Sequence, residues 1–174
     1  MSLELEAPQD PAVPDADPEA VARQILLRRL TDRPRSRAEL AEALAKRSVP
    51  DDVATRLLDR FTEVGLIDDG AFARAWVDSR MTGKGLAGRS LAIELRRKGI
   101  DDDLAREVLD AIEPDDEEAA ARRVVRSKLR SVRRLEPEVQ SRRLFGVLAR
   151  KGYPPGVAVR IVREELAAAP VSAD

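Results

Sequence analysis

The same pattern of apolar residues occurs three times along this chain, and that repetition constrains its fold more than any other feature. Three segments of 25 residues, which begin at Arg37, Gly88 and Ser141, align without a gap at their apolar positions. Their starts are 51 and 53 residues apart. The aligned leucine pairs are Leu40 and Leu44, Leu91 and Leu95, and Leu144 and Leu148. A period of about 50 residues indicates an architecture that uses one supersecondary unit several times.

Each segment is expected to form two helices joined by a tight turn. A spacing of four places both leucines of a pair on one helix face. Lys98–Gly99 and Lys151–Gly152 then match the end of a helix, where glycine tolerates the left-handed conformation and a cation suits the negative end of the dipole. Asp51, Asp101 or Pro154 begins the next helix, and carboxylates in its first turn suit its positive end.

A third helix is predicted to precede each pair. Its apolar residues are spaced four apart and are Val21 and Ile25, Phe72 and Trp76, and Val125 and Leu129. Ile25, Trp76 and Leu129 each lie 15 residues before the leucine that they match. The residues expected in the core are Ile25, Leu40, Leu44, Phe72, Trp76, Leu91, Leu95, Ile100, Leu129, Leu144, Leu148 and Tyr153.

The chain is therefore predicted to be all-α, with nine helices in three tandem three-helix repeats. The expected boundaries are 18–67, 68–113 and 114–167. A unit of about 50 residues buries little surface alone, so neighbouring units should stack into an elongated, curved body. Residues 1–17 are acidic and proline-rich without helical periodicity and are expected to be disordered, and the tail at 168–174 is expected to fray.

The composition excludes several classes of function. The chain has no His and no Cys, which excludes Cys/His zinc sites, disulfide frameworks, Ser-His-Asp triads and cysteine nucleophiles. The remaining reactive side chains form no recognisable catalytic constellation, so no enzyme activity and no cofactor are predicted. Asp68 and Asp69 are expected to cap a helix, because two adjacent carboxylates alone are a poor metal site. No apolar run is long enough to span a bilayer, and we expect a cytoplasmic monomer.

A glycine-rich link at Gly83–Gly88 could in principle cradle a phosphate. Its spacing matches neither a P-loop nor the dinucleotide-binding fingerprint. A flexible loop with helix caps is the favoured interpretation.

Charge is strongly segregated although the net charge is only −1. Residues 1–20 carry six acids and no base, and residues 101–120 carry ten acids and one Arg. Residues 120–163 instead carry thirteen Lys and Arg against two Glu. Like charges that are not neutralised repel each other, so this segment favours an anionic partner.

The candidate binding surface consists of basic residues in the second and third repeats. These are Arg80, Lys84, Arg89, Arg96, Arg97, Lys98, Arg122, Arg123, Arg126, Lys128, Arg130, Arg133, Arg134, Arg142, Arg143, Arg150 and Lys151. Helical spacing places Arg122, Arg126, Arg130 and Arg133 on one face, which should be exposed while the adjacent stripe of Val125, Leu129 and Val132 packs. With 3% aromatic residues, stacking on single-stranded bases is not expected to dominate binding.

The most specific stretch, Gly65–Ile100, resembles the signature of the RecX family. The matching elements are Gly65–Asp69, Phe72–Ala73, Trp76–Val77, Arg80, the glycine-rich link, Leu91, Leu95 and Lys98–Ile100. The threefold helical pattern resembles the family over about 18–167. The acidic N-terminal segment is not part of the shared pattern.

The resemblance implies a regulator of the RecA recombinase with no catalytic residues of its own. Proteins of this family bind RecA, mainly as its filament on single-stranded DNA, and some bind DNA directly. The resemblance further implies inhibition of ATP hydrolysis, strand exchange and co-protease activity, and so regulation of homologous recombination, DNA repair and the SOS response. On this view the basic surface contacts either DNA phosphates or an acidic groove of RecA.

Two other functions remain open from the residues alone. The segment from Arg37 resembles the helices of a winged-helix DNA-binding protein, which would act without RecA. A winged helix needs a β-hairpin after Gly65–Ile67, whereas Asp69 is expected to start another helix. The second possibility is a passive helical scaffold that binds unrelated proteins.

Overall fold

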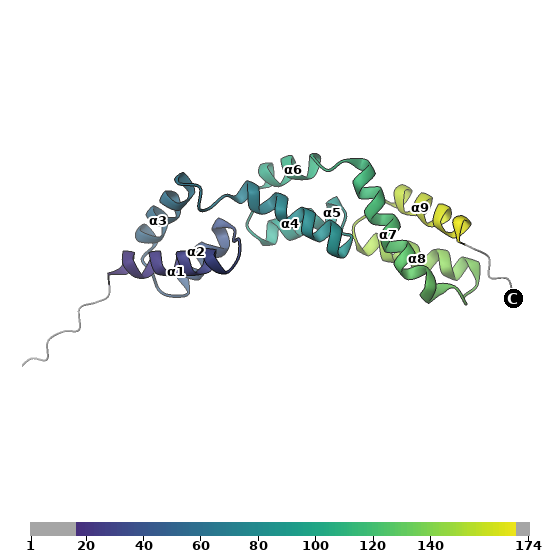
Figure 1. The fold of residues 1–174 in the computed structure, drawn as a ribbon, viewed down its shortest axis with the longest axis horizontal. Coiled ribbons are helices and arrows are strands. Elements are labelled where there is room, and N and C mark those ends of the chain that lie inside the picture. The colour runs from purple at the N-terminus through teal and green to yellow at the C-terminus, as the bar shows by residue number, and fades with distance from the viewer. Residues whose placement is uncertain (1–16, 170–174) are drawn as a thin grey trace, which may run out of the picture. The chain divides into compact units, whose positions relative to one another are not determined.

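The computed structural model describes residues 17–169, and every regular element in that range is an α-helix. The helices are α1 (Pro18–Asp32), α2 (Arg37–Ala45), α3 (Asp51–Glu63), α4 (Asp69–Lys84), α5 (Gly88–Arg97), α6 (Asp102–Asp110), α7 (Pro114–Val132), α8 (Pro137–Arg150) and α9 (Pro155–Ala168). They form three successive three-helix repeats, α1–α3, α4–α6 and α7–α9 (Figure 1), which confirms the predicted fold class.

Residues 1–16 and 170–174 lie outside the described part of the chain, and with them most of the segments expected to be disordered or frayed. Ala168 still belongs to α9. None of the helices between residues 17 and 169 is long and apolar enough to cross a membrane. The hairpin that a winged helix requires is not found in this range, because α4 follows α3 after a short turn.

The described chain divides into two compact units. The first contains the chain up to Pro34 and Leu40–Ile67, and the second contains Arg35–Glu39 and everything from Asp68 onward. The short segment Arg35–Glu39, which includes the first turn of α2, therefore groups with the second unit. The elongated, curved arrangement of the three repeats stays a prediction.

The first unit is held together by a small core of leucines. Leu26 of α1 and both leucines of α2, Leu40 and Leu44, are fully buried. Leu57 and Phe61 of α3 close the same cluster.

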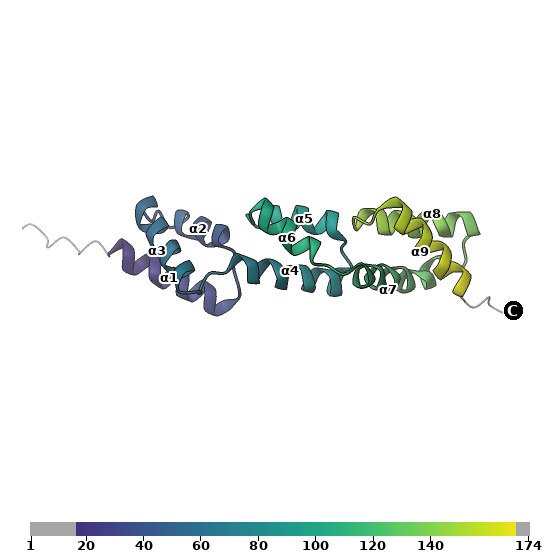
Figure 2. The ribbon, with the colours of Figure 1, turned by 90° about the horizontal axis from the view of Figure 1, so that it is seen from above.

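The second unit contains one core for each of its two repeats. Leu91 and Leu95 of α5 are fully buried in the first, and Leu144 and Leu148 of α8 are buried in the second. Figure 2 shows α4 and α7 following one another along one side of this unit, with α5, α6, α8 and α9 on the other. Ala87, just before α5, packs into the core of the last repeat, which joins the two cores.

Local sequence signals set the ends of the helices as expected. Asp68 accepts a hydrogen bond from the backbone N–H of Ala71 at 2.8 Å and so begins α4, and Asp101 caps α6 in the same way. Gly99 and Gly152, which follow α5 and α8, have φ angles of 71° and 93°. The equivalent position in the first repeat, Ser48, adopts φ 54° without being glycine.

Asp69 differs from its expected role. Its Oδ1 accepts a hydrogen bond at 2.8 Å from the N–H of Arg37, at the start of α2. Glu117 makes the same contact in the next repeat, where its Oε1 accepts from the N–H of Gly88 at 2.9 Å. In both cases a carboxylate from the first turn of one repeat caps the middle helix of the repeat before it in sequence.

The predicted inner face of the first helix is one residue out of place in α1 and only partly so in α4, where the predicted Phe72 is buried. Ala22 and Leu26 are fully buried in α1, whereas Ile25 is only partly buried. In α4, Ala73 and Val77 are buried, and Trp76 lies at the edge of the core. The small alanines permit close packing of the helices, and a pattern search for large apolar residues overlooks them.

The third repeat contains an insertion that the gap-free alignment missed. Matching the buried Val77 to the buried Val125 gives an offset of 48 residues for the first helices, although the middle helices differ by 53. The ends of α4 and α7, Lys84 and Val132, also differ by 48. The additional residues lengthen the link and add a turn at the start of α8. Leu129 is therefore not the counterpart of Trp76, although it still packs partly against the core.

The glycine-rich link is a tight connection and not a flexible loop. Gly83 lies inside α4, and only Gly85–Ala87 separates α4 from α5. The carbonyl of Gly85 accepts a hydrogen bond from the Tyr153 hydroxyl at 3.0 Å, and the N–H of Ala87 donates to the carbonyl of Lys151 at 2.9 Å. Burial raises the pKa of Tyr153 to about 12, so its hydroxyl stays a donor.

Close approach of α7 explains why glycine is needed at position 85. A Cβ added to Gly85 would lie 2.3 Å from Val124 Cγ2, and the residue has φ 61°. Gly65 has a similar φ of 75° but nothing within 4 Å of its Cβ position. Comparing substitutions at Gly65 and Gly85 therefore separates the cost of backbone strain from the cost of close packing.

We predict that Gly65→Ala lowers the free energy of unfolding by about 1 kcal/mol through backbone strain alone. Gly85→Ala should cost about 1–3 kcal/mol more, because Val124 must also move. Urea unfolding followed by circular dichroism tests this, with Trp76 fluorescence as a reporter of the second unit. Equal losses for the two variants would contradict the close approach.

Candidate functional site

The structure divides the predicted basic surface into exposed and engaged residues. The exposed ones are Lys84, Arg89, Arg96, Arg97, Arg123, Arg126, Lys128, Arg130, Arg133, Arg134, Arg142, Arg143 and Arg150. The partly buried ones are Arg80, Lys98, Arg122 and Lys151. The partners of the second group, and of some members of the first, decide which cations remain able to bind a ligand.

Arg80 and Lys98 enclose the single tryptophan of the chain. The guanidinium carbon of Arg80 lies 4.1 Å from the centre of the Trp76 ring, and Lys98 Nζ lies 4.6 Å from it. Trp76 also stacks on Phe72, with ring centres 5.7 Å apart. These cation–π contacts stabilise the second repeat and engage both cations.

Two carboxylates complete the charge balance around this tryptophan. Glu94 Oε2 accepts from Trp76 Nε1 at 2.8 Å and lies 2.9 Å from Arg80 Nε. Glu39 pairs with Lys98 at 2.7 Å, and the side chains of both are about four-fifths buried. Arg80 and Lys98 therefore have partners within the fold, and their part in a binding surface stays a prediction.

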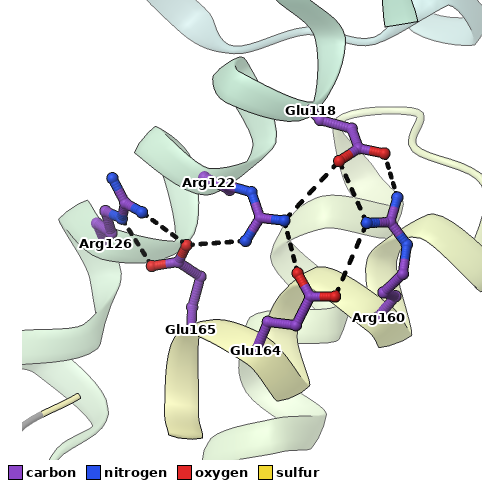
Figure 3. A network of polar contacts seen from close by, with 6 residues as sticks. All are labelled: Glu118, Arg122, Arg126, Arg160, Glu164 and Glu165. Carbon is purple, nitrogen blue, oxygen red and sulfur yellow. Dashed lines mark hydrogen bonds and ion pairs between the residues drawn. The ribbon is translucent and has the colours of Figure 1, made fainter. Parts of the chain in front are cut away.

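A second network joins α7 to α9 and engages two arginines of the predicted face (Figure 3). Glu165 is 5% exposed, and its carboxylate accepts hydrogen bonds from Arg126 Nε at 2.6 Å and from Arg122 Nη1 at 3.2 Å. Arg122 also pairs with Glu164 at 2.5 Å. The hydrogen bonds from Arg126, and then those from Arg122, lower the pKa of Glu165 below its usual value.

The same network continues to the start of α7. Arg160 pairs with Glu118 and lies 3.8 Å from Glu164. Hydrogen bonding with Arg160 lowers the pKa of Glu118. The sequence analysis missed these acids as partners because the local pattern records the excess of arginine in α7 and cannot show which helix packs against it. The signal was present as adjacent glutamates, Glu164–Glu165, at the end of a basic segment.

Three lysines from separate parts of the sequence instead lie near one another, and none of them pairs with a carboxylate of residues 17–169. Lys84 ends α4, Lys128 lies on α7 and Lys151 follows α8. The Lys151 ammonium donates to the carbonyl of Lys84. Its pKa is lowered first by burial and then by the like charges of Lys128 and Lys84. We call these three residues the lysine cluster.

The lysine cluster is suited to binding an anion. Within residues 17–169, none of the three ammonium groups forms an ion pair with a carboxylate. An approaching phosphate or carboxylate would offset the burial and the like charges that lower the pKa of Lys151. The described residues contain no group of acids arranged to hold a metal ion.

We predict that Glu165→Gln lowers the free energy of unfolding by about 1–2 kcal/mol at pH 7, because charge-assisted hydrogen bonds to Arg122 and Arg126 are weakened. The lowered pKa means that Glu165 stabilises the fold above the ordinary value of about 4.3, and that this contribution disappears as the pH falls through the lowered value. Urea unfolding at several pH values measures the difference.

The exposed carboxylate of Glu107 on α6 provides a matched control, and Glu107→Gln should change the stability little at any pH. A difference between the parent and Glu165→Gln that stays constant from pH 7 to acid would contradict the assigned role of the network.

Comparison with known proteins agrees with this architecture. Family models for RecX match three consecutive segments: the first three-helix domain at residues 22–61, the second at 68–109 and the third at 115–162. A crystal structure of RecX from Lactobacillus salivarius superimposes with a TM-score of 0.79 at 18% identity, covering 87% of this chain and 99% of that one. A second crystal structure, described as regulatory protein RecX, gives a TM-score of 0.75 at 21% identity, with 86% and 73% covered.

Several relatives share a higher sequence identity with this chain than these two crystal structures do. The regulatory protein RecX of Thermobifida fusca is 54% identical over 89% of this chain and 84% of its own length. That of Streptomyces coelicolor is 52% identical over 88% and 81%, and that of Mycobacterium avium is 46% identical over 91% and 92%. With all three domain types matched in order and this identity over most of both chains, the protein belongs to the RecX family of regulatory proteins.

Proposed function

We propose that this protein binds the RecA filament on single-stranded DNA and inhibits its ATP hydrolysis, strand exchange and co-protease activity. It would thereby regulate recombinational repair and the SOS response. Family membership supports a regulatory role. The observation that carries the binding proposal is the lysine cluster, where Lys84, Lys128 and Lys151 lie near one another and pair with no carboxylate of the described residues.

The proposed mechanism is occlusion and not chemistry. The last two repeats form one unit, so the exposed cations of α5, α7 and α8 belong to one compact body. Such a body would contact successive filament subunits or the phosphates between them. If it binds one packing state of the filament more tightly, it shifts the population toward that state. We expect a monomer in the cytoplasm to suffice for this action.

The contacts that four cations make within the fold narrow the choice of residues that bind the partner. Arg80, Lys98, Arg122 and Arg126 are held by carboxylates or by Trp76, so changing them would disturb the fold. We propose the exposed residues Lys84, Lys128, Arg130 and Arg134 as contacts to the partner. Direct binding to DNA without RecA is the second candidate, and the same lysine cluster would serve it.

The first prediction for this function concerns the ATP hydrolysis of the cognate RecA on single-stranded DNA. Titration of this protein at fixed salt should reduce hydrolysis at well below one molecule per RecA, because each bound molecule would affect a row of subunits. Reduction only near one molecule per RecA would indicate coating or competition for DNA. The absence of any effect with folded protein would exclude RecA as the partner.

A second prediction concerns the lysine cluster. The double variant Lys84→Glu and Lys128→Glu should bind the RecA–DNA filament about tenfold or more weakly, because two cations are replaced by anions at one site. If these lysines contact phosphates, the variant should also lower the slope of log affinity against log salt by about 2. Fluorescence anisotropy with labelled single-stranded DNA, with and without RecA, measures both quantities.

Arg106→Glu serves as the control, since Arg106 is an exposed cation of the same unit whose ion pair with Asp103 lies on the acidic helix α6. Its affinity should equal that of the parent. Equal binding by the double variant and the parent would remove the lysine cluster from the interface.

A further inference from the structure

In the second and the third repeats, one face is covered by the chain segment that leads into the middle helix of the preceding repeat. In the second repeat this face includes Trp76 and Lys98. The carbonyl of Lys98 accepts from the Ser36 hydroxyl at 2.6 Å, while its ammonium pairs with Glu39 at 2.7 Å. Ser36 and Glu39 also bond reciprocally to each other's backbone N–H, which forms a capping box. The segment Arg35–Glu39 thus covers this face with a carboxylate on the cation.

The third repeat has a covered face of the same kind at equivalent positions. Val124 and Lys151 correspond to Trp76 and Lys98. The carbonyl of Lys151 accepts from the N–H of Ala87 at 2.9 Å, and Gly85 packs closely on Val124. Here too the covering segment immediately precedes a middle helix.

The first repeat has the same face with no covering segment among residues 17–169. The positions equivalent to Trp76, Arg80 and Lys98 are Ile25, Arg29 and Arg47. They line a groove of about 570 Å³, whose walls come from α1 and from α2 and the turn after it. The remaining lining residues are Val21, Gln24, Arg28, Asp32 and Ala43.

The chemistry of this groove favours an acidic occupant. Its floor is apolar, with Val21 and Ile25 partly buried. Arg28, Arg29 and Arg47 are exposed around it and have no ion-pair partner within residues 17–169. Because the equivalent Lys98 takes a carboxylate from its covering segment, Arg47 is suited to do the same.

A second copy of the chain does not supply a matching segment. The residues equivalent to Arg35–Glu39 in the last repeat lie inside α8, because that helix begins a turn earlier. Arg143 occupies the position of Glu39 and would meet Arg47 with like charge. Head-to-tail association through this groove is therefore disfavoured.

We propose that residues 1–16 of this chain bind in the groove and cover the outer face of the first repeat. This segment has four acids and no basic side chain, and Leu3 and Leu5 alternate with Glu4 and Glu6. Leucines would contact the apolar floor while the glutamates pair with the arginines.

The connection also permits this contact. The segment joins the chain at Asp17, the N-cap of α1, and α1 forms one wall of the groove. Sixteen residues reach at most about 50–55 Å, whereas the wall from Val21 to Asp32 is only about 18 Å long. Covalent attachment raises the local concentration to about the millimolar range, so a weak contact suffices. The bound segment would cap the exposed face of the first repeat.

The absence of cysteine from the sequence makes a direct test simple. A nitroxide attached to Ser2→Cys in the full-length, ¹⁵N-labelled protein should cause loss of the amide signals of Ala43 and Arg47. These residues lie far from position 2 in sequence, so proximity requires the segment to fold back. The double variant Arg28→Glu and Arg47→Glu should restore both signals, because the groove would then repel the acids.

Arg60→Glu is the matched control, since Arg60 is an exposed arginine of α3 outside the groove. That variant should leave the signal loss unchanged. Unchanged loss in the double variant, or equal loss over Arg60 and Glu63, would overturn the proposal. Signal loss in a mixture of ¹⁵N-labelled protein without nitroxide and unlabelled protein with nitroxide would assign the groove to a second copy and also overturn it. The test does not depend on RecA.

Discussion

The contact at the end of the middle helix governs how this protein is built. Lys98 and Lys151 each stand before a glycine with positive φ, and each offers its carbonyl and its ammonium to a segment that precedes another middle helix. A small repeat buries too little surface to be stable alone, so the hydrogen bonds and the close packing at these positions fix one repeat against its neighbouring segment. Gly85 shows the consequence, since a single methyl group there would displace Val124.

Electrostatics have two roles in this chain. Arg80, Lys98, Arg122 and Arg126 neutralise acids, and Arg80 and Lys98 also enclose Trp76, so these four cations stabilise the fold. Within residues 17–169 the lysine cluster has no such carboxylate partner, and burial and then like charges lower the pKa of Lys151. Uncompensated positive charge on a compact unit is suited to attract an anionic partner.

Much of the fold could be predicted from local patterns. The leucine pairs, the cap at Asp68 and the glycines at 99 and 152 depend on neighbours within a few residues, and the structure agrees with them. The inner face of α1 was misplaced because Ala22 looks unimportant by size although it permits close helix packing. The extra turn of α8 was hidden because a gap-free match of leucines cannot detect an insertion before them.

The sequence by itself determined that the chain is helical, that it repeats three times, and that its largest excess of positive charge lies in the last repeat. Those properties follow from residue type and spacing, which act through the backbone within one or two helical turns. Only the tertiary structure decided which cations are used internally. Arg126 and Lys128 are two residues apart and both positively charged, yet Arg126 meets the buried Glu165 of α9 while Lys128 lies near two other lysines. Their difference depends on which distant segments pack beside them, and local sequence does not contain that information.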